Sequence, residues 1–192
     1  YEEEYRAYGF DYPSPGVRVD MFEEGVQIIK NMWINSPANF TGKYYQIDNV
    51  YCEPRPDPEP ILMLGGGGEK KTLKVVAQYA DWWNDVMRPI PDLKRKLEIL
   101  KDHCESVGSD FGNIRKTLAP RFFIDKNHKK ALEMAEGKND SGQVIAGDPS
   151  AICEQLHELV EMGFDMVITT FPRFQDLDDM KLFVEKVIPN FK

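Results

Sequence analysis

The stretch that decides the fold reads ILMLGGGGEKKTLKVVAQYADWWNDV and runs from Ile61 to Val86. Its first four residues, Ile61 to Leu64, are apolar and are typical of a short buried strand. Four glycines follow and indicate a tight turn. Apolar residues then recur at helical spacing from Leu73 to Ala80, and Trp82 to Val86 is again strand-like. The stretch therefore predicts a strand, a glycine turn, a helix and a second strand.

This order of strand and helix continues to the end of the chain. Because each strand needs a helix to return the chain to its starting side, four such units predict an α/β fold with a parallel sheet. The later units are the strand Trp82–Val86 with a helix from Leu93 to Val107, the strand Thr117–Ile124 with a weak helix at His128–Glu136 and another that begins after Asp148, and the strand Met166–Phe171 with a helix from Leu177 to Val187.

Two architectures fit these units: an open doubly wound sheet and a piece of a (β/α)₈ barrel. A complete barrel uses about 250 residues for eight units, whereas this chain spends the 132 residues from Ile61 to Lys192 on four. By that count half of a barrel is present. Before it, a helix is expected over Val19–Trp33. We interpret residues 1–192 as a single domain, with residues 35–60 as a proline-rich insertion loop.

Composition excludes several function classes. The chain has 24 Lys and Arg against 32 Asp and Glu, and it lacks a basic stripe, so we expect no nucleic-acid partner. Charges interrupt every apolar run, so no membrane segment is expected. The three cysteines are too few for a disulfide framework, which favours a cytoplasmic protein. The three histidines are scattered, and no metal site is predicted.

The glycine turn is the strongest candidate site. Glycines after a strand let a bulky anion approach the backbone, and the first turn of the next helix offers unpaired N–H groups. A phosphate group is therefore the predicted ligand. The alternative is a purely structural turn that requires positive φ. The candidate binding residues are Gly65, Gly66, Gly67, Gly68, Glu69, Lys70, Lys71 and Thr72.

A second set of polar residues lies at the ends of the other strands, where ligands of α/β folds bind. Each of them taken singly is also explained by a strand-end cap or a rim ion pair. No Ser/His/Asp or Cys/His arrangement and no carboxylate pair stands out, so the catalytic residues remain unassigned. The set comprises Asn84, Asp85, Arg121, Thr169, Thr170 and Arg173.

Three stretches together resemble the luciferase-like monooxygenase family of flavin- and coenzyme F420-dependent oxidoreductases. The opening YEEEYRAYGFDYPSPGVRVDMFEEGVQIIKNMW is similar to the family segment after the fourth barrel strand. The segment FTGKYYQIDNVYCEPRPDPEPILMLGGGGEKKTLKVVAQYADWWN is similar to the next one, with its glycine-rich turn after the fifth strand. The late GFDMVITTFP resembles the eighth strand.

The resemblance implies a (β/α)₈ barrel that binds FMN or coenzyme F420 at the C-terminal ends of its strands. By position, Gly65 to Gly68 with Glu69 to Thr72 match the segment that holds the cofactor phosphate. The resemblance also implies that the first four strands are absent and that the catalytic groups lie upstream of Tyr1. The intact enzyme would transfer hydride through the cofactor to a small-molecule substrate.

Two other interpretations remain open: a non-catalytic flavin-binding protein with a truncated barrel, and an open-sheet phosphate-binding module. For a half barrel we expect two open sheet edges, and therefore a homo-oligomer or association with the missing N-terminal half. We also expect an apolar inner face on the sheet. That face is predicted to comprise Leu62, Leu64, Phe122, Ile124, Val167 and Ile168.

Overall fold

The computed structural model describes residues 1–138, 143–171 and 177–191. Its centre is a four-stranded sheet in the order β3-β4-β5-β8, with every neighbouring pair parallel. The order rises along the sequence without reversal, whereas a doubly wound sheet reverses at a switch point. The sheet therefore winds in one direction. Its strands are β3 Met63–Gly65, β4 Trp82–Val86, β5 Arg115–Ala119 and β8 Phe164–Val167.

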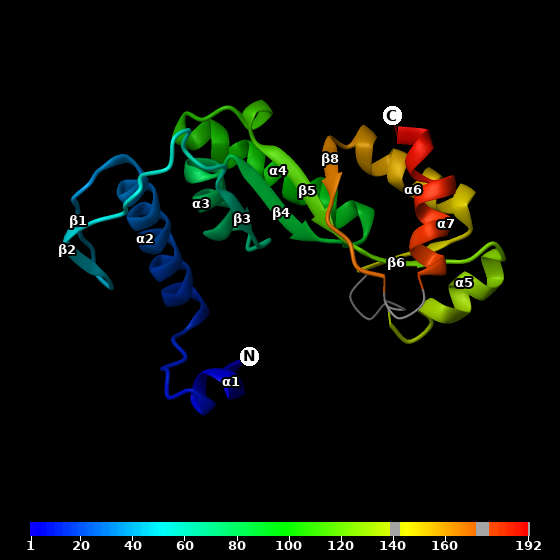
Figure 1. The fold of residues 1–192 in the computed structure, drawn as a ribbon, viewed down its shortest axis with the longest axis horizontal. Coiled ribbons are helices and arrows are strands. Elements are labelled where there is room, and N and C mark those ends of the chain that lie inside the picture. The colour runs from blue at the N-terminus through cyan, green and yellow to red at the C-terminus, as the bar shows by residue number, and fades with distance from the viewer. Residues whose placement is uncertain (139–142, 172–176, 192) are drawn as a thin grey trace.

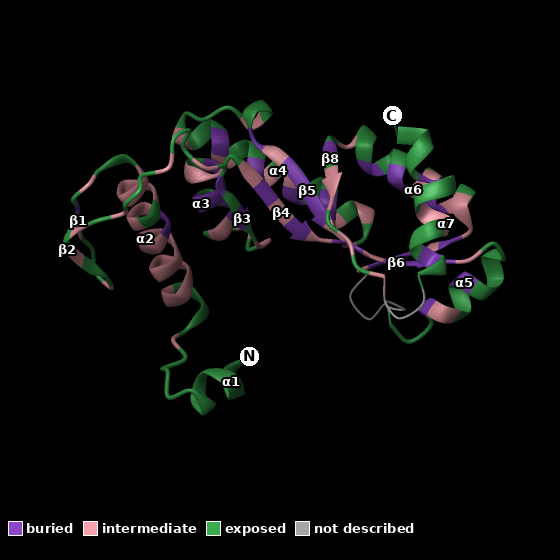
Figure 2. Cartoon of the chain, in the orientation of Figure 1, coloured by how far each residue is buried: buried purple, intermediate pink, exposed green. Residues whose placement is uncertain are grey.

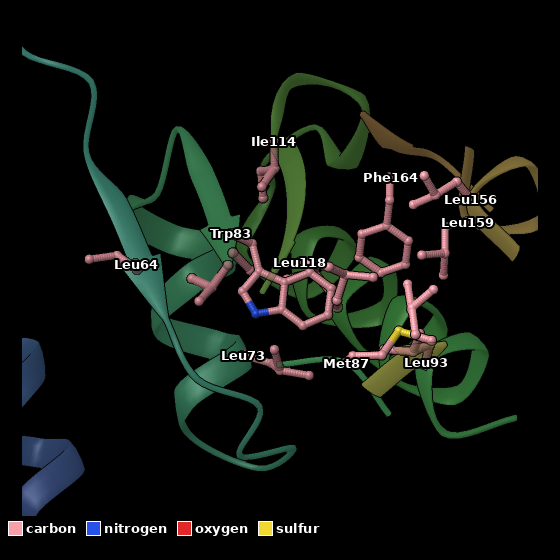
Figure 3. Packing of buried hydrophobic residues seen from close by; sticks show 14 of the residues in the cluster. Leu64, Leu73, Trp83, Met87, Leu93, Ile114, Leu118, Leu156, Leu159 and Phe164 are labelled. Atoms are coloured by element: carbon pink, nitrogen blue, oxygen red, sulfur yellow. The ribbon is translucent and has the colours of Figure 1, made fainter. Parts of the chain in front are cut away.

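Helices follow the strands, as the sequence predicted, and the hydrophobic core lies between the two (Figure 1). Trp83 of β4 is at the middle of this core, with Leu73, Leu118 and Phe164 around it (Figure 3). The rings of Trp83 and Phe164 lie 6.2 Å apart. The helices are α3 Thr72–Tyr79, α4 Ile90–Val107, α5 His128–Ala135, α6 Pro149–Glu161 and α7 Asp178–Lys186, and short 3₁₀ turns occupy Phe111–Asn113 and Ile188–Phe191.

The predicted strand Thr117–Ile124 is two strands, which corrects the sequence interpretation. β5 ends at Ala119, and β6 (Arg121–Ile124) pairs instead with β7 (Val144–Gly147) in a separate parallel sheet. Pro120 stands between β5 and β6, and a proline has no N–H group to continue a ladder. The four-residue strand β7 was not predicted, because it is short and follows a polar stretch.

The apolar inner face was also predicted wrongly in large part. Leu62, Leu64, Phe122 and Ile124 are buried in the core that contacts the helices. Because side chains alternate along a strand, the opposite face carries Met63, Asn84 and Thr117 instead. Of the predicted face, Val167 is half-buried and Ile168 is 44% exposed.

The first sixty residues form a separate-looking arm (Figure 1). Helix α1 (Glu2–Ala7) has no buried residue and stands away from the sheet (Figure 2). Helix α2 (Pro15–Ile34) includes the predicted helix and contacts α3. Within the predicted insertion loop, β1 (Ala38–Thr41) and β2 (Gln46–Val50) form an antiparallel hairpin.

A single carboxylate of α2 holds the turn of this hairpin. Glu24 accepts hydrogen bonds from the backbone N–H groups of Lys43 at 2.7 Å and of Tyr44 and Tyr45 at 2.9 Å each. Desolvation raises the pKa of the Glu24 carboxyl group, but the three backbone hydrogen bonds and the nearby Lys43 ammonium outweigh it, so the pKa is lowered overall. The ionised form therefore fastens the hairpin to α2.

This clamp predicts a pH-dependent hairpin. Because the folded-state pKa of Glu24 is depressed, its stabilising contribution is present above the unfolded-state pKa and is lost as the pH falls through the folded-state value. We expect Glu24→Gln to speed amide hydrogen exchange at residues 43–45 at neutral pH. The control Glu23→Gln, on the neighbouring residue, should leave that exchange unchanged. Equal exchange in both variants would contradict the clamp.

Candidate functional site

The glycine turn between β3 and α3 has an unusual polarity. Four successive backbone carbonyls, those of residues 66 to 69, all accept hydrogen bonds, three from side chains of β4 and α4 and one from the first turn of α3. The donors are Trp83 Nε1 to Gly66 at 2.9 Å, Lys96 Nζ to Gly67, the Leu73 N–H to Gly68 at 3.0 Å, and His103 Nε2 to Glu69 at 2.7 Å.

Most backbone N–H groups of the same turn have no hydrogen-bond acceptor among the described residues. Those of residues 67 to 72 donate to no acceptor in the part of the chain that the structure describes, whereas the N–H of Gly66 bonds the Asn84 carbonyl at 3.0 Å. Only Thr72 of these residues belongs to α3, and the others form the loop that leads into it. Unpaired N–H groups carry partial positive charge, and the dipole of α3 adds to it at the N-terminus of the helix. Carbonyls turned inward and N–H groups left unpaired make this turn suited to an anion.

Only one of the glycines requires its special backbone. Gly66 has φ +119°, which side chains rarely tolerate, so the structural explanation of the turn holds there. Gly67 is needed for space. A Cβ built on it would lie 2.5 Å from Asp85 Oδ2 and 2.9 Å from Lys96 Nζ.

The predicted side-chain donors are only partly available. The Lys71 ammonium bonds the Asp20 carboxylate and lies 3.4 Å from the Gly16 carbonyl, so α2 holds it. The Glu69 carboxylate pairs with Arg95 at 3.0 Å. Lys70 is exposed and keeps its ammonium without a partner among the described residues. The hydroxyl of half-buried Thr72 has no hydrogen-bond partner among the described residues. The unpaired backbone, Lys70 and Thr72 are therefore the groups left for a ligand.

Two buried charged side chains, Lys96 and Asp85, lie next to Gly67 of the turn. Lys96 is 6% exposed and Asp85 3%. Asp85 accepts from Arg88 Nε at 3.0 Å and from Nη2 at 3.2 Å, and this bond raises the pKa of Arg88. The sequence analysis included Asp85 among the strand-end residues but missed Lys96. One signal was present: Lys96 lies on the apolar stripe of α4, three residues after Leu93 and four before Leu100.

The other strand-end residues separate into two groups. Asn84 lies beside the turn, and its Oδ1 accepts from Thr117 Oγ1 at 2.8 Å. Arg121 of β6 and Thr170, beyond the end of β8, form an isolated bridge, and beside it Thr169 Oγ1 donates to the Pro120 carbonyl at 2.9 Å. Arg173 lies outside the described residues. Among the described members of this set, the structure therefore brings Asn84 and Asp85 to the glycine turn and leaves Arg121, Thr169 and Thr170 apart from it.

Two further findings concern metal ions and membranes. No group of three His, Cys, Asp or Glu residues able to hold a metal ion occurs in the described ranges. Among the same residues, no helix combines the length and apolar character needed to cross a bilayer. Half-buried His103 anchors the glycine turn, because its Nε2 donates to the Glu69 carbonyl and must therefore carry a proton.

Comparison with known proteins identifies the family. The model of the luciferase-like monooxygenases matches residues 1–143. The chain belongs to this family. The F420-dependent glucose-6-phosphate dehydrogenase of Amycolatopsis mediterranei is 21% identical over 96% of this chain. This luciferase-like chain spans 65% of the length of that relative.

Solved structures of other proteins show the same fold. An F420-dependent secondary alcohol dehydrogenase in complex with an F420–acetone adduct superimposes with a TM-score of 0.81 at 20% identity, over 95% of this chain and 64% of that one. An EDTA monooxygenase from Chelativorans sp. BNC1 gives a TM-score of 0.75 at 14% identity, over 96% and 62%. The described α/β fold is therefore that of luciferase-like proteins.

The close packing at Gly67 predicts a sharp contrast between two neighbouring glycines. Gly67→Ala forces the buried Asp85 carboxylate to move, and overpacking of this kind costs about 1–3 kcal/mol. Gly65→Ala places its Cβ 3.8 Å from the Asn84 carbonyl oxygen, an ordinary contact, and should change stability by less than about 0.5 kcal/mol. Urea denaturation of both variants measures the difference. Equal stabilities would show that Gly67 has room to spare.

Proposed function

We propose that the chain forms the part of a luciferase-like oxidoreductase that holds the phosphate of FMN or coenzyme F420 at the glycine turn. The observation that carries the proposal is the polarity of the glycine turn, where the carbonyls of residues 66–69 accept hydrogen bonds while the N–H groups of residues 67–72 are unpaired among the described residues. A phosphate offers several acceptor oxygens and a negative charge, which match this arrangement.

The chain's own residues would bind and orient the cofactor. Backbone N–H groups of residues 67–72 hold the phosphate, and the Lys70 ammonium adds a mobile positive charge from the exposed side. The bound flavin or deazaflavin ring would supply hydride-transfer chemistry, and the protein would fix its position. The glycine turn follows the C-terminal end of β3, the end of parallel strands at which ligands bind.

Similar structures with bound F420 and with bound FMN support the proposal. One similar structure is a complex with an F420–acetone adduct, and another, the oxygenating constituent of 3,6-diketocamphane monooxygenase, is a complex with FMN. We extend to this chain the use of one of these cofactors with a small-molecule substrate. Its three free cysteines accord with a cytoplasmic location. The catalytic groups would lie in barrel units outside the matched part of the relatives.

We also propose that further β/α units complete the barrel, supplied either by a longer polypeptide or by a second copy. Both edge strands, β3 and β8, lie beside apolar grooves. The groove between β3 and α2 has a volume of about 1180 Å³, and the one between β8 and α6 about 650 Å³. Met63 on one edge strand and Ile168, just after the other, are 37% and 44% exposed. Unpaired parallel edges favour association.

The phosphate proposal makes a direct prediction. When inorganic phosphate is added to the ¹⁵N-labelled chain, the amide resonances of residues 67–72 should shift, because their unpaired N–H groups acquire acceptors. FMN should produce the same shifts at lower concentration than riboflavin, which has no phosphate. Amides of the β1–β2 hairpin serve as internal controls. Shifts confined to other regions would overturn the phosphate assignment.

The open edges make a second prediction. The Leu62 carbonyl accepts from β4, so by strand alternation the N–H and C=O of Met63 face the free edge. At micromolar concentration we expect the purified 22.1 kDa chain to sediment as a larger species. Met63→Pro removes an edge N–H and should shift the equilibrium toward monomer, whereas Leu132→Lys, on α5, should not. A wild-type monomer would contradict self-association.

A further inference from the structure

The peptide plane links each inward carbonyl of the glycine turn to an outward N–H. A trans peptide holds the C=O of one residue and the N–H of the next on opposite sides of the same rigid plane. A donor that binds the Gly67 carbonyl from within the protein therefore turns the Gly68 N–H outward. In the same way Trp83 sets the N–H of Gly67, and His103 sets that of Lys70.

Glycine peptides need such anchors more than others. Without a Cβ, Gly67 and Gly68 reach both signs of φ at little cost, so the plane between them is free to turn over. Turned over, it would direct the Gly67 carbonyl oxygen toward a bound phosphate, and two negative groups would face each other. Something must therefore select one orientation of this central peptide.

Lys96 is placed to make that selection. Its ammonium donates to the Gly67 carbonyl and lies 3.7 Å from Glu69 Oε1. The Lys96 side chain is buried, and the loss of hydrogen-bond acceptors by a buried ammonium group costs considerable free energy. The other buried charge at this point, Asp85, is engaged by Arg88. The Gly67 carbonyl would thus be held by a buried ammonium group that does not itself contact the ligand.

We propose that Lys96 is a positioning residue that locks the Gly67–Gly68 peptide in the phosphate-binding orientation. This inference rests on the proposed cofactor site, because it specifies how that site is kept ready. Trp83 and His103 set the flanking peptides, but Trp83 is fully buried in the core and cannot be replaced without disturbing it. Lys96 is therefore the anchor that substitution tests most cleanly.

The test compares Lys96→Met, which keeps the length of the side chain and removes its donor, with Lys96→Arg, which keeps a cation. Lys94→Met, an exposed position on the same helix, is the matched control. Without any ligand, Lys96→Met should move the carbonyl-carbon resonance of Gly67 and the amide resonance of Gly68. With inorganic phosphate as the probe, its dissociation constant should rise at least tenfold, and Lys96→Arg should recover most of that loss.

The outcomes separate the two proposals. If wild-type chain does not bind phosphate at residues 67–72, the proposed function fails, while the ligand-free resonances still test the role of Lys96. If wild-type binds and Lys96→Met binds within twofold of it, the positioning role is overturned. Should Lys96→Met not fold, the wild-type ammonium decides: slow exchange of its protons, slower still with phosphate, supports the role, and fast exchange overturns it.

Discussion

The hydrogen bond from the Trp83 indole to the Gly66 carbonyl joins the core of this protein to its candidate site. The indole is fully buried, so its single N–H must find an acceptor, and the acceptor is the first carbonyl after β3. Packing of the sheet against the helices thereby fixes where the glycine turn begins. The two contacts from α4, those of Lys96 and His103, then orient the later peptides of the turn.

Local patterns in the sequence predicted much of this arrangement. Short apolar runs predicted strands β3 and β4, which begin after Leu62 and Asp81. Gly108 was expected to end α4, and it does so with φ 74°, a left-handed conformation that glycine adopts readily. Asp148 caps α6 by accepting from the Ser150 and Ala151 N–H groups, as its position before Pro149 predicted. The break at Pro120 was also visible, yet the apolar residues on both sides suggested one strand.

The candidate site was harder to predict because its support comes from distant segments. Lys96 follows Gly67 by 29 residues and His103 follows Glu69 by 34, so neither appears in the glycine motif. Asp20, which holds Lys71, precedes it by 51 residues. The motif predicted the place of the turn and its exposed backbone. Which side chains remain free depends on how α2 and α4 pack, and no local pattern contains that.

The Glu24 clamp on the β1–β2 hairpin shows that neighbouring backbone N–H groups do not by themselves make a site for a free anion. Residues 43–45 present three neighbouring N–H groups to one carboxylate, much as a receptor presents them to an ion, but the ionised Glu24 of the same chain supplies that carboxylate. A tethered carboxylate has a very high local concentration, and free anions cannot compete with it. The protein thus has one group of neighbouring N–H groups, at residues 43–45, that its own Glu24 carboxylate accepts from, and another, at residues 67–72, that donates to no acceptor among the described residues. The connection of Glu24 to the same chain makes the difference between them.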